Sequence, residues 1–460
     1  MGLMKYIEPI KTFVLIILVL LSITLTFSIW SYSPNYQTIE KTVPQNVVID
    51  KKKTISQVVK PYKLIAQHDD EFSGTVKTSD IDALYDVLKN SQLSDLSMIS
   101  EKLSHEKMYE LMKANDTVSL MFSDEVPMSI FQSILPTVNK KVSGIEFSQM
   151  IISLKKPNNE SINDNELDVY FASPETHELY SAKLHLKKSE AFIAKQLKMT
   201  KKYDEYTVIE TSSGRIMYVL ADKPKFAKQQ YFARNVSAKV DQFKNALFTN
   251  PKIVKTSQDS MTNIDKYSDD RSVMTIYNNQ YTLNFANMSA ESDERISKSH
   301  LIDHTMSFVN EHGGFTNDYR YEGVNYGEQK VLYQLFMSDL PVEPATQTTS
   351  TEIEVKINNG TVARYARPYY QLETIPDDES NNLTMLKTAR QVYRMLVTEQ
   401  VVKRNQIEDL RLGYSMSFKE RDNGAVVFTL EPTWFYKVKE DWITVAPEQA
   451  TVGGDQYGLE

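Results

Sequence analysis

Apolar residues divide the chain into one uniformly hydrophobic segment near the N-terminus and a long remainder of mixed pattern. Residues 12–30 read TFVLIILVLLSITLTFSIW, which is 19 residues without a charged side chain. A helix of that length extends about 28 Å, close to the hydrocarbon thickness of a bilayer. The pattern therefore predicts a transmembrane helix over residues 12–30.

The flanks of this segment predict its orientation. Lys5 and Lys11 precede it, and the aromatic residues Trp30, Tyr32 and Tyr36 follow it, where an outer aromatic belt belongs. We therefore expect residues 1–11 to be cytoplasmic and the bulk of the chain to be extracytoplasmic, in a single-pass protein of the cell membrane. The competing interpretation is a cleaved signal peptide, but the apolar segment is longer than such peptides usually have.

The remainder alternates between strand-like and helix-like patterns. Ile81, Leu84, Tyr85 and Leu88 recur at helical spacing after Ser79, a plausible N-cap. Asn278-Asn279 and Asn359-Gly360 separate pairs of apolar runs, as hairpin turns do. Near the C-terminus a helix followed by antiparallel strands is expected twice. The first helix begins at Ser292 and stops at Gly313-Gly314, and the second is capped by Asn382.

These patterns predict an α+β fold of antiparallel sheets with packed helices, organised as several domains. The expected divisions are a linker over residues 31–45, domain 1 over 46–187, domain 2 over 188–291, a C-terminal domain over 292–446 and a flexible tail over 447–460.

The amino-acid composition excludes several classes of protein function. The chain has 460 residues, no cysteine and a formal net charge of -8. The absence of cysteine excludes disulfides, cysteinyl zinc, iron–sulfur clusters and thiol catalysis. The acidic balance argues against nucleic acid as a partner, because no basic excess exists to neutralise phosphates.

No motif for catalysis or for a cofactor is recognisable. His300 and His304 have a metal-ligand spacing, but the apolar stripe of their helix (Ile302, Met306, Val309) places them on its solvent side. We therefore expect no catalytic, cofactor-binding or metal-binding residues. Acidic clusters at 69–71 and 377–379 leave one alternative open, a cell-wall-binding protein or wall hydrolase. A basic stripe of Lys387, Arg390 and Arg394 is expected to be a solvated helix face.

Two polar residues of the hydrophobic segment are candidates for partner contact. Ser22 and Thr26 are four residues apart and so share one helix face. Small polar residues at this spacing allow helices to approach closely in lipid. Single Ser and Thr residues are also tolerated in any membrane anchor, so the residues alone leave both interpretations open.

Both ends of the chain resemble the YycH (WalH) family of Gram-positive Firmicutes. The N-terminal resemblance runs from Met4 to Glu40 and includes the aromatic residues around Pro34-Asn35-Tyr36. The C-terminal resemblance covers VVFTLEPTWFYKVKEDWITV, residues 426–445. Chain length and element order agree with the family.

The resemblance implies a regulator rather than an enzyme. Family members pair with a single-pass partner, YycI, and together contact the sensor histidine kinase YycG (WalK), which phosphorylates YycF (WalR) to control wall metabolism. It further implies a YycI-like fold for the C-terminal domain and a kinase contact through the membrane helix, for which Ser22 and Thr26 are the candidates. We also hypothesise that the extracytoplasmic part senses a cell-wall-derived ligand. Four C-terminal aromatics are expected to provide partner contact or supporting core: Trp434, Phe435, Tyr436 and Trp442.

Overall fold

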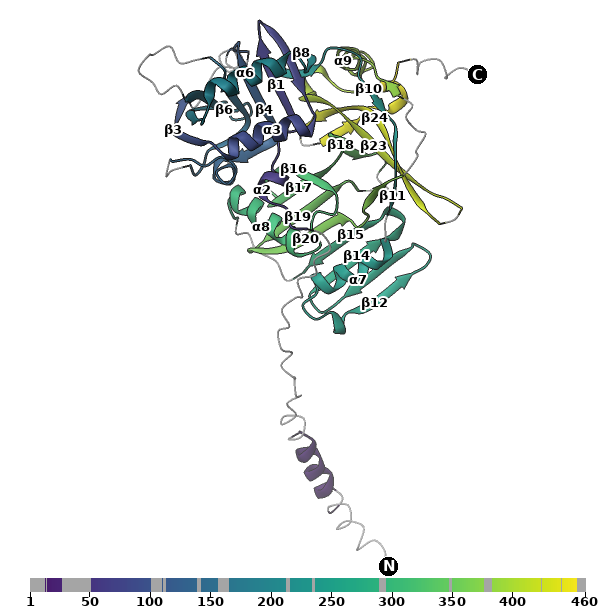
Figure 1. Cartoon of the computed structure of the whole chain (residues 1–460). Helices are drawn as coiled ribbons and strands as arrows, with labels where there is room; N and C mark the ends of the chain where they lie inside the picture. Colours follow the sequence, from purple (N-terminus) through teal and green to yellow (C-terminus); the bar gives the residue numbers. More distant parts are fainter. Residues whose placement is uncertain are drawn as a thin grey trace, which may run out of the picture. The chain divides into compact units, whose positions relative to one another are not determined.

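The computed structural model of the chain divides into two compact units, residues 1–43 and 44–460 (Figure 1). The described residues are 13, 15–26, 51–100, 110, 113–138, 142–155, 165–211, 216–233, 236–288, 295–346, 350–375, 383–422, 424–439 and 441–452.

In the first unit, Phe13 and residues 15–26 are helical, and their apolar side chains are exposed, with Leu15 at 61%. Among the described residues, no helix combines the length and the apolar character needed to cross a membrane. The other residues of the predicted span 12–30, including Trp30, lie outside the described residues, as do the predicted cytoplasmic segment 1–11 and the linker 31–45.

Among the described residues, nine strands form a first sheet in the order β3-β7-β6-β5-β4-β1-β2-β8-β9, with every neighbouring pair antiparallel. Its strands are β1 (Lys63–His68), β2 (Glu71–Thr75), β3 (Gln92–Ser100), β4 (Thr117–Pro127), β5 (Glu146–Ser153), β6 (Glu166–Ser173), β7 (Glu178–His185), β8 (Asp204–Glu210) and β9 (Ile216–Leu220). The sheet therefore continues past residue 187, where the sequence suggests a domain boundary.

A second sheet of 14 strands, counted over the described residues, has the path β12-β13-β14-β15-β20-β19-β17-β18-β23-β24-β11-β21, with β16 beside β17 and β25 beside β24. Its strands are β11 (Gln229–Ala233), β12 (Lys255–Asp259), β13 (Ile264–Ser268), β14 (Ser272–Tyr277), β15 (Thr282–Asn287), β16 (Asp318–Asn325), β17 (Lys330–Met337), β18 (Leu340–Pro344), β19 (Glu352–Asn358), β20 (Thr361–Pro368), β21 (Leu372–Thr374), β23 (Asp409–Glu420), β24 (Val426–Val438) and β25 (Asp441–Thr444). Strands β18 and β23 pair in parallel. A separate pair joins β10 (Lys225–Ala227) to β22 (Leu383–Met385).

Helices cover these sheets. The described helices are α2 (Ile55–Val58), α3 (Thr78–Lys89), α5 (Met128–Phe131), α6 (Ser189–Thr200), α7 (Val236–Leu247), α8 (Lys298–Glu311), α9 (Ala389–Thr398) and α10 (Pro447–Ala450), with 3-10 turns at Pro251–Ile253, Asn278–Gln280 and Arg404–Gln406. Helices α3 and α6 lie over the same face of the first sheet (Figure 1) and contribute Leu84 and Phe192 to the main core. The expected α+β class with antiparallel sheets is confirmed.

The helical periodicity was predictive, whereas the expected caps were displaced. Ile81, Leu84, Tyr85 and Leu88 are the buried residues of α3, but its N-cap is Lys77, so Ser79 lies inside the helix. Helix α8 is capped by Ser297 rather than beginning at Ser292. Helix α9 is capped by Thr388, whose hydroxyl accepts a hydrogen bond from the backbone N–H of Gln391. The predicted cap Asn382 lies outside the described residues.

The turn predictions are confirmed where the structure describes them. Asn359 and Gly360 have φ of 49° and 64° and join β19 to β20, as a type I′ hairpin requires. The amide of Gly314 donates to Val309 O at 2.7 Å and ends α8. The expected tail from Pro447 starts with α10, in which Ala450 is buried. Residues 453–460 lie outside the described residues.

Candidate functional site

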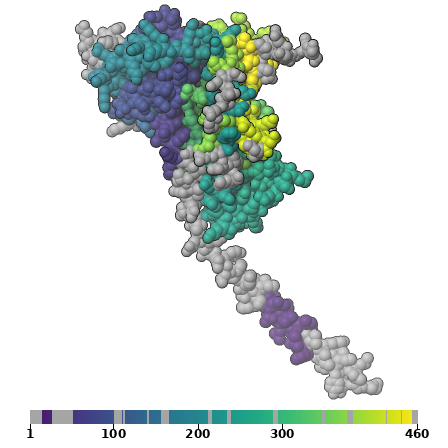
Figure 2. Space-filling model, turned by 45° about the vertical axis from the view of Figure 1, so that its right-hand side comes forward, coloured from purple at the N-terminus to yellow at the C-terminus, as the bar shows by residue number. Residues whose placement is uncertain are grey.

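Strand β4 of the first sheet meets β16 of the second through polar contacts. The hydroxyl of Tyr321 donates to Glu125 O at 2.8 Å, and the amide of Val324 donates to a carboxylate oxygen of Asp124 at 2.9 Å. Figure 2 shows residues of the first sheet, purple to blue, on one side and C-terminal residues, yellow, on the other, with green residues between them. The junction brings charged side chains from both sheets together.

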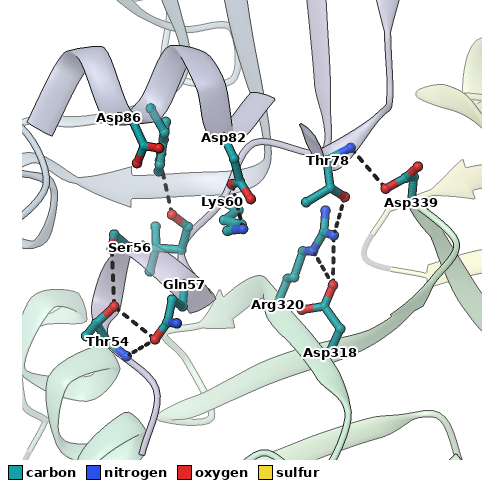
Figure 3. A network of polar contacts seen from close by, with 12 residues as sticks. Thr54, Ser56, Gln57, Lys60, Thr78, Asp82, Asp86, Asp318, Arg320 and Asp339 are labelled. Carbon is teal, nitrogen blue, oxygen red and sulfur yellow. Dashed lines mark hydrogen bonds and ion pairs between the residues drawn. The ribbon is translucent and has the colours of Figure 1, made fainter. Parts of the chain in front are cut away.

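A second group of contacts fixes the same junction around Arg320 (Figure 3). Its guanidinium donates to Thr78 Oγ1 and to Asp318 Oδ2, both at 2.8 Å. The backbone amide of Thr78, at the start of α3, donates to Asp339 Oδ1 at 3.0 Å (Figure 3). Because Arg320 is only 2% exposed, these bonds hold the start of α3 against β16 in a defined position.

A β-bulge shapes β16 at this point. Tyr321 pairs with Tyr333 and Gly323 pairs with Leu332, so Glu322 is the extra residue of the bulge. A Cβ atom at Gly323 would lie 2.7 Å from Asp124 Oδ2. The bulge thus depends on a glycine that lets Asp124 reach the amide of Val324.

We expect Gly323→Ala to lower the free energy of unfolding by about 1–3 kcal/mol, because it displaces the buried acceptor Asp124. The measurement is the urea midpoint of the purified protein. Gly327→Ala is the matched control, since its Cβ would meet only Asn325 Oδ1 at an ordinary 3.4 Å. Equal midpoints for the two variants would contradict the close packing inferred at the junction.

A pocket of about 560 Å³ opens at this junction. Most of its lining is charged, and it is supplied by both sheets and by the start of α8: Asp124, Glu125, Glu175, Lys298, Glu322, Gly323, Val324, Asn325, Lys330, Leu332, Glu343, Glu352, Glu354, Glu408, Lys437, Lys439, Asp441 and Trp442. We call it the junction pocket.

Arg411 on β23 contacts three residues that line the junction pocket, Glu322, Glu343 and Trp442. We call the cluster of Arg411 with the lining carboxylates Glu322, Glu343 and Glu352 the pocket floor. The guanidinium of Arg411 donates to Glu322 Oε1 at 2.6 Å and to Glu343 Oε1 at 2.7 Å. The three side chains are between 3% and 9% exposed. The plane of Arg411 also stacks on the ring of Trp442, 3.8 Å from its centroid. One buried cation thus holds two buried carboxylates.

Burial dominates the titration of these groups. It raises the pKa of Glu343 to about 8 although Arg411 opposes the shift, with Glu352 and Glu322 adding to it. The pKa of Glu352 rises to about 7 through burial and the nearby carboxylates Glu322 and Glu354. Burial alone would lower the pKa of Arg411, but Glu322 and Glu343 raise it above its usual value. The pocket floor therefore carries more carboxylate than its own cation can stabilise at neutral pH.

Lys298, at the start of α8, neutralises the other end of the junction pocket. Its ammonium lies 2.5 Å from Glu146 Oε2 and 3.2 Å from Glu125 Oε2. Glu125 also accepts a hydrogen bond from Ser173 Oγ. Burial opposes ionisation of Glu125, but the hydrogen bonds from Ser173 and Lys298 contribute to a lowered pKa. The acidic groups at this end are already paired within the protein.

The four C-terminal aromatics occupy two different environments. Trp434, Phe435 and Tyr436 are 1%, 0% and 6% exposed. Trp434 and Tyr436 pack with α9, and the indole N–H of Trp434 donates to Lys387 O at 2.9 Å. Trp442 on β25 is half-buried and lines the junction pocket. The structure therefore separates Trp442 from the other three.

Other residues singled out in the sequence lie apart from this pocket. His300 is exposed and His304 half-exposed, and the described residues contain no group of three or more His, Asp or Glu side chains suited to a metal ion. Asp69 and Asp70 form the turn between β1 and β2. The acidic cluster 377–379 lies outside the described residues.

Sequence reasoning missed the junction pocket because its carboxylates are dispersed along the chain. They come from β4, β16, β18, β19 and β25 and from the loop positions Glu175 and Glu408, which are far apart in the sequence. The only local signal was the alternation of β19, in which Glu352 and Glu354 lie on the face opposite to Ile353 and Val355.

The similarity to known proteins extends over both units of the chain. The N-terminal domain of the YycH protein matches residues 8–202, and its C-terminal domain matches residues 214–450. The chain belongs to the YycH family.

One protein sequence and one solved structure, both described as YycH of Bacillus subtilis, are similar to this chain. The "Two-component system WalR/WalK regulatory protein YycH" of strain 168 is 25% identical over 474 residues, covering 98% of this chain and 99% of the relative. The crystal structure of YycH from the same species has a TM-score of 0.71 at 19% identity, covering 86% of this chain and 98% of that chain. The fold described above is thus the fold of a YycH protein.

Proposed function

We propose that this protein is a membrane-anchored regulator of a two-component system of the WalR/WalK type and not an enzyme. The observation that carries the proposal is the nearly full-length match to the Bacillus subtilis protein described as regulating WalR/WalK. Both YycH domains are matched, so the likeness extends over the whole regulator.

The proposed anchor is a single transmembrane helix over residues 12–30, with residues 1–11 cytoplasmic and the remainder outside the cell. Its support is the uncharged segment of 19 residues and the helical conformation of residues 15–26. The proposed division of the remainder is a linker (31–45), two α+β domains (46–187 and 188–291), a YycI-like domain (292–446) and a tail (447–460).

The proposed partners are a WalK-type sensor kinase and a YycI-type single-pass protein. Ser22 and Thr26 are proposed to contact a partner helix in the bilayer. The hydroxyl of Thr26 donates to Ser22 O at 2.8 Å, so its donor is satisfied inside the helix while its lone pairs stay available to a neighbour. In the extracytoplasmic part, the half-buried Trp442 is the best placed of the four C-terminal aromatics for partner contact.

Replacing Ser22 and Thr26 with Leu should reduce kinase association by about 5- to 150-fold, the range of typical coupling free energies of 1–3 kcal/mol. The measurement is crosslinking and affinity purification of the tagged full-length protein from its native membranes, with transcription of the regulated genes as a second readout. Thr24→Leu is the matched control, because Thr24 also bonds within the helix, to Leu20 O, but lies on another face.

Three outcomes separate the interpretations. Loss of the kinase in the double variant alone supports contact through the Ser22–Thr26 face. Equal recovery from all variants means that this face is not used, and exchange of the whole helix for an unrelated anchor then tests the bilayer contact itself. Recovery of neither a kinase nor a second single-pass protein from the wild type contradicts the regulator and favours a wall-binding protein or wall hydrolase, which digestion of purified cell walls would detect.

A further inference from the structure

The floor of the junction pocket has an excess of carboxylate over the cations that face it. Arg411 alone bridges Glu322 and Glu343, and within the described residues Glu352 has no ion-pair partner. Lys298 is paired with Glu125 and Glu146, and Lys330 is paired with Glu328 and Glu354. Together with Lys437 and Lys439 they give four ammonium groups against nine carboxylates among the described residues that line the pocket. A third ionised carboxylate beside this cluster is unfavourable unless a proton neutralises it or another cation binds.

Two buried atoms of this cluster, Glu322 Oε2 and Arg411 Nε, lack a hydrogen-bond partner within the described residues. Glu322 Oε1 binds Arg411, whereas Oε2 is buried and has no hydrogen-bond partner within the described residues. The side chain is only 9% exposed, and Glu322 lines the pocket. Leaving a buried acceptor of a charged group unsatisfied is costly, so a ligand that brings a donor to Glu322 would gain free energy of binding.

We propose that the junction pocket binds a small organic cation, whose primary ammonium or guanidinium group is held by Glu322 and Glu352 beside the ring of Trp442. Ammonium and guanidinium groups carry several N–H donors and no acceptor, so they match a site built from carboxylate oxygens. The ring of Trp442 stacks on Arg411 and also lines the pocket, where it would supply apolar contact for the stem of the ligand.

The size and charge of the pocket fit this class of ligand. A volume of about 560 Å³ is within the range of small-molecule sites. Burial is the main cause of the raised pKa values of Glu343 and Glu352, and neighbouring carboxylates raise both pKa values further. A bare metal ion fits less well, because the described residues contain no cluster of three or more metal-binding side chains.

Binding is tested with the purified full-length protein in detergent, by isothermal titration calorimetry. The probes are Nα-acetyl-lysine methylamide and Nα-acetyl-arginine methylamide, with Nα-acetyl-norleucine methylamide as the uncharged match. We expect at least one cationic probe to bind and the norleucine probe to bind at least tenfold more weakly, since it lacks the N–H donors.

Two variants locate the site. Glu352→Gln is expected to weaken binding of the cationic probe at least tenfold, and Glu322→Gln is expected to do the same. Asp86→Asn is the matched control, because it removes one negative charge from an exposed position on α3. Unchanged thermal midpoints of Glu352→Gln would establish that this variant is folded, which keeps the test valid if Glu322→Gln unfolds.

Several results would overturn the proposal. They are equal binding of the norleucine probe, unchanged affinity in folded Glu352→Gln, binding of Ca²⁺ without either organic cation, and no binding of either cationic probe up to about 10 mM. None of these outcomes bears on kinase association, so the proposed regulatory function stands or falls separately.

Discussion

Replacing Arg411 with Met is expected to lower the free energy of unfolding by about 3–5 kcal/mol, the usual effect of removing one partner from a buried ion pair. The change leaves Glu322 and Glu343 facing each other without a cation and removes the stacking on Trp442. The measurement is the urea unfolding midpoint of the purified protein, followed by fluorescence and circular dichroism together.

The penalty should grow with pH. A carboxyl group whose pKa is higher in the folded than in the unfolded state contributes stability at low pH that is lost as pH rises through its folded value. For Glu352 and Glu343 those values are about 7 and about 8. Since Arg411 opposes the shift of Glu343, its removal makes ionisation costlier still, and the variant should lose more stability at pH 8 than at pH 5.

Arg364→Met provides the matched control. Arg364 lies 3.5 Å from Glu354, but its side chain is 50% exposed. Exposed ion pairs contribute about 0–1 kcal/mol, so this variant should unfold close to the wild type at both pH values. An Arg411→Met variant as stable as Arg364→Met would mean that Glu322 and Glu343 are not held as a buried charged cluster.

The second large effect is expected for Trp434→Ala, at about 3–5 kcal/mol, because the substitution leaves a large cavity. Trp434 is 1% exposed and packs in one cluster with Leu386, Ala389 and Val392 around α9. The same change removes the hydrogen bond to Lys387 O. Thermal and urea unfolding of the purified protein measure the loss.

Trp442→Ala distinguishes packing from partner contact. Its ring is half-buried and stacks on Arg411, so the expected loss of stability is about 1–2 kcal/mol. If Trp434→Ala left the midpoint unchanged and lowered recovery of the kinase or the single-pass partner, Trp434 would be a contact residue rather than core. If Trp442→Ala kept its fold and lost partner recovery, the contact would lie at Trp442.

The local pattern of apolar residues was sufficient to predict many helices and strands of this fold and insufficient to predict others. The helical spacing of Ile81, Leu84, Tyr85 and Leu88 was sufficient to predict α3, because these are the residues that the helix buries. Strand β12 was not predicted, since all five of its residues are exposed and carry no apolar signal. The caps of α8 and α9 are Ser297 and Thr388 because several Ser, Thr and Asn residues compete for each helix start, whereas α3 begins after Lys77 without a side-chain cap.

The junction pocket could not be predicted from the sequence for a different reason. Glu322 turns toward Arg411 because a bulge adds one residue to β16, and a single inserted residue leaves no trace in the apolar period. Nothing in the sequence around Arg411 distinguishes it from an exposed polar residue of a strand. Its burial follows from the parallel pairing of β18 with β23, two segments that share no sequence signal.

The path of the chain through the second sheet also constrains the order in which the protein folds. Strand β11, near residue 230, pairs with β24 through contacts such as Tyr231 with Phe428, and β10 pairs with β22. These pairings close loops of more than 150 residues, and such long-range contacts slow folding. Strands β10 and β11 therefore cannot form these pairs until β22 and β24, near the C-terminal end of the chain, have been synthesised. During synthesis, that interval leaves sheet edges exposed to aggregation.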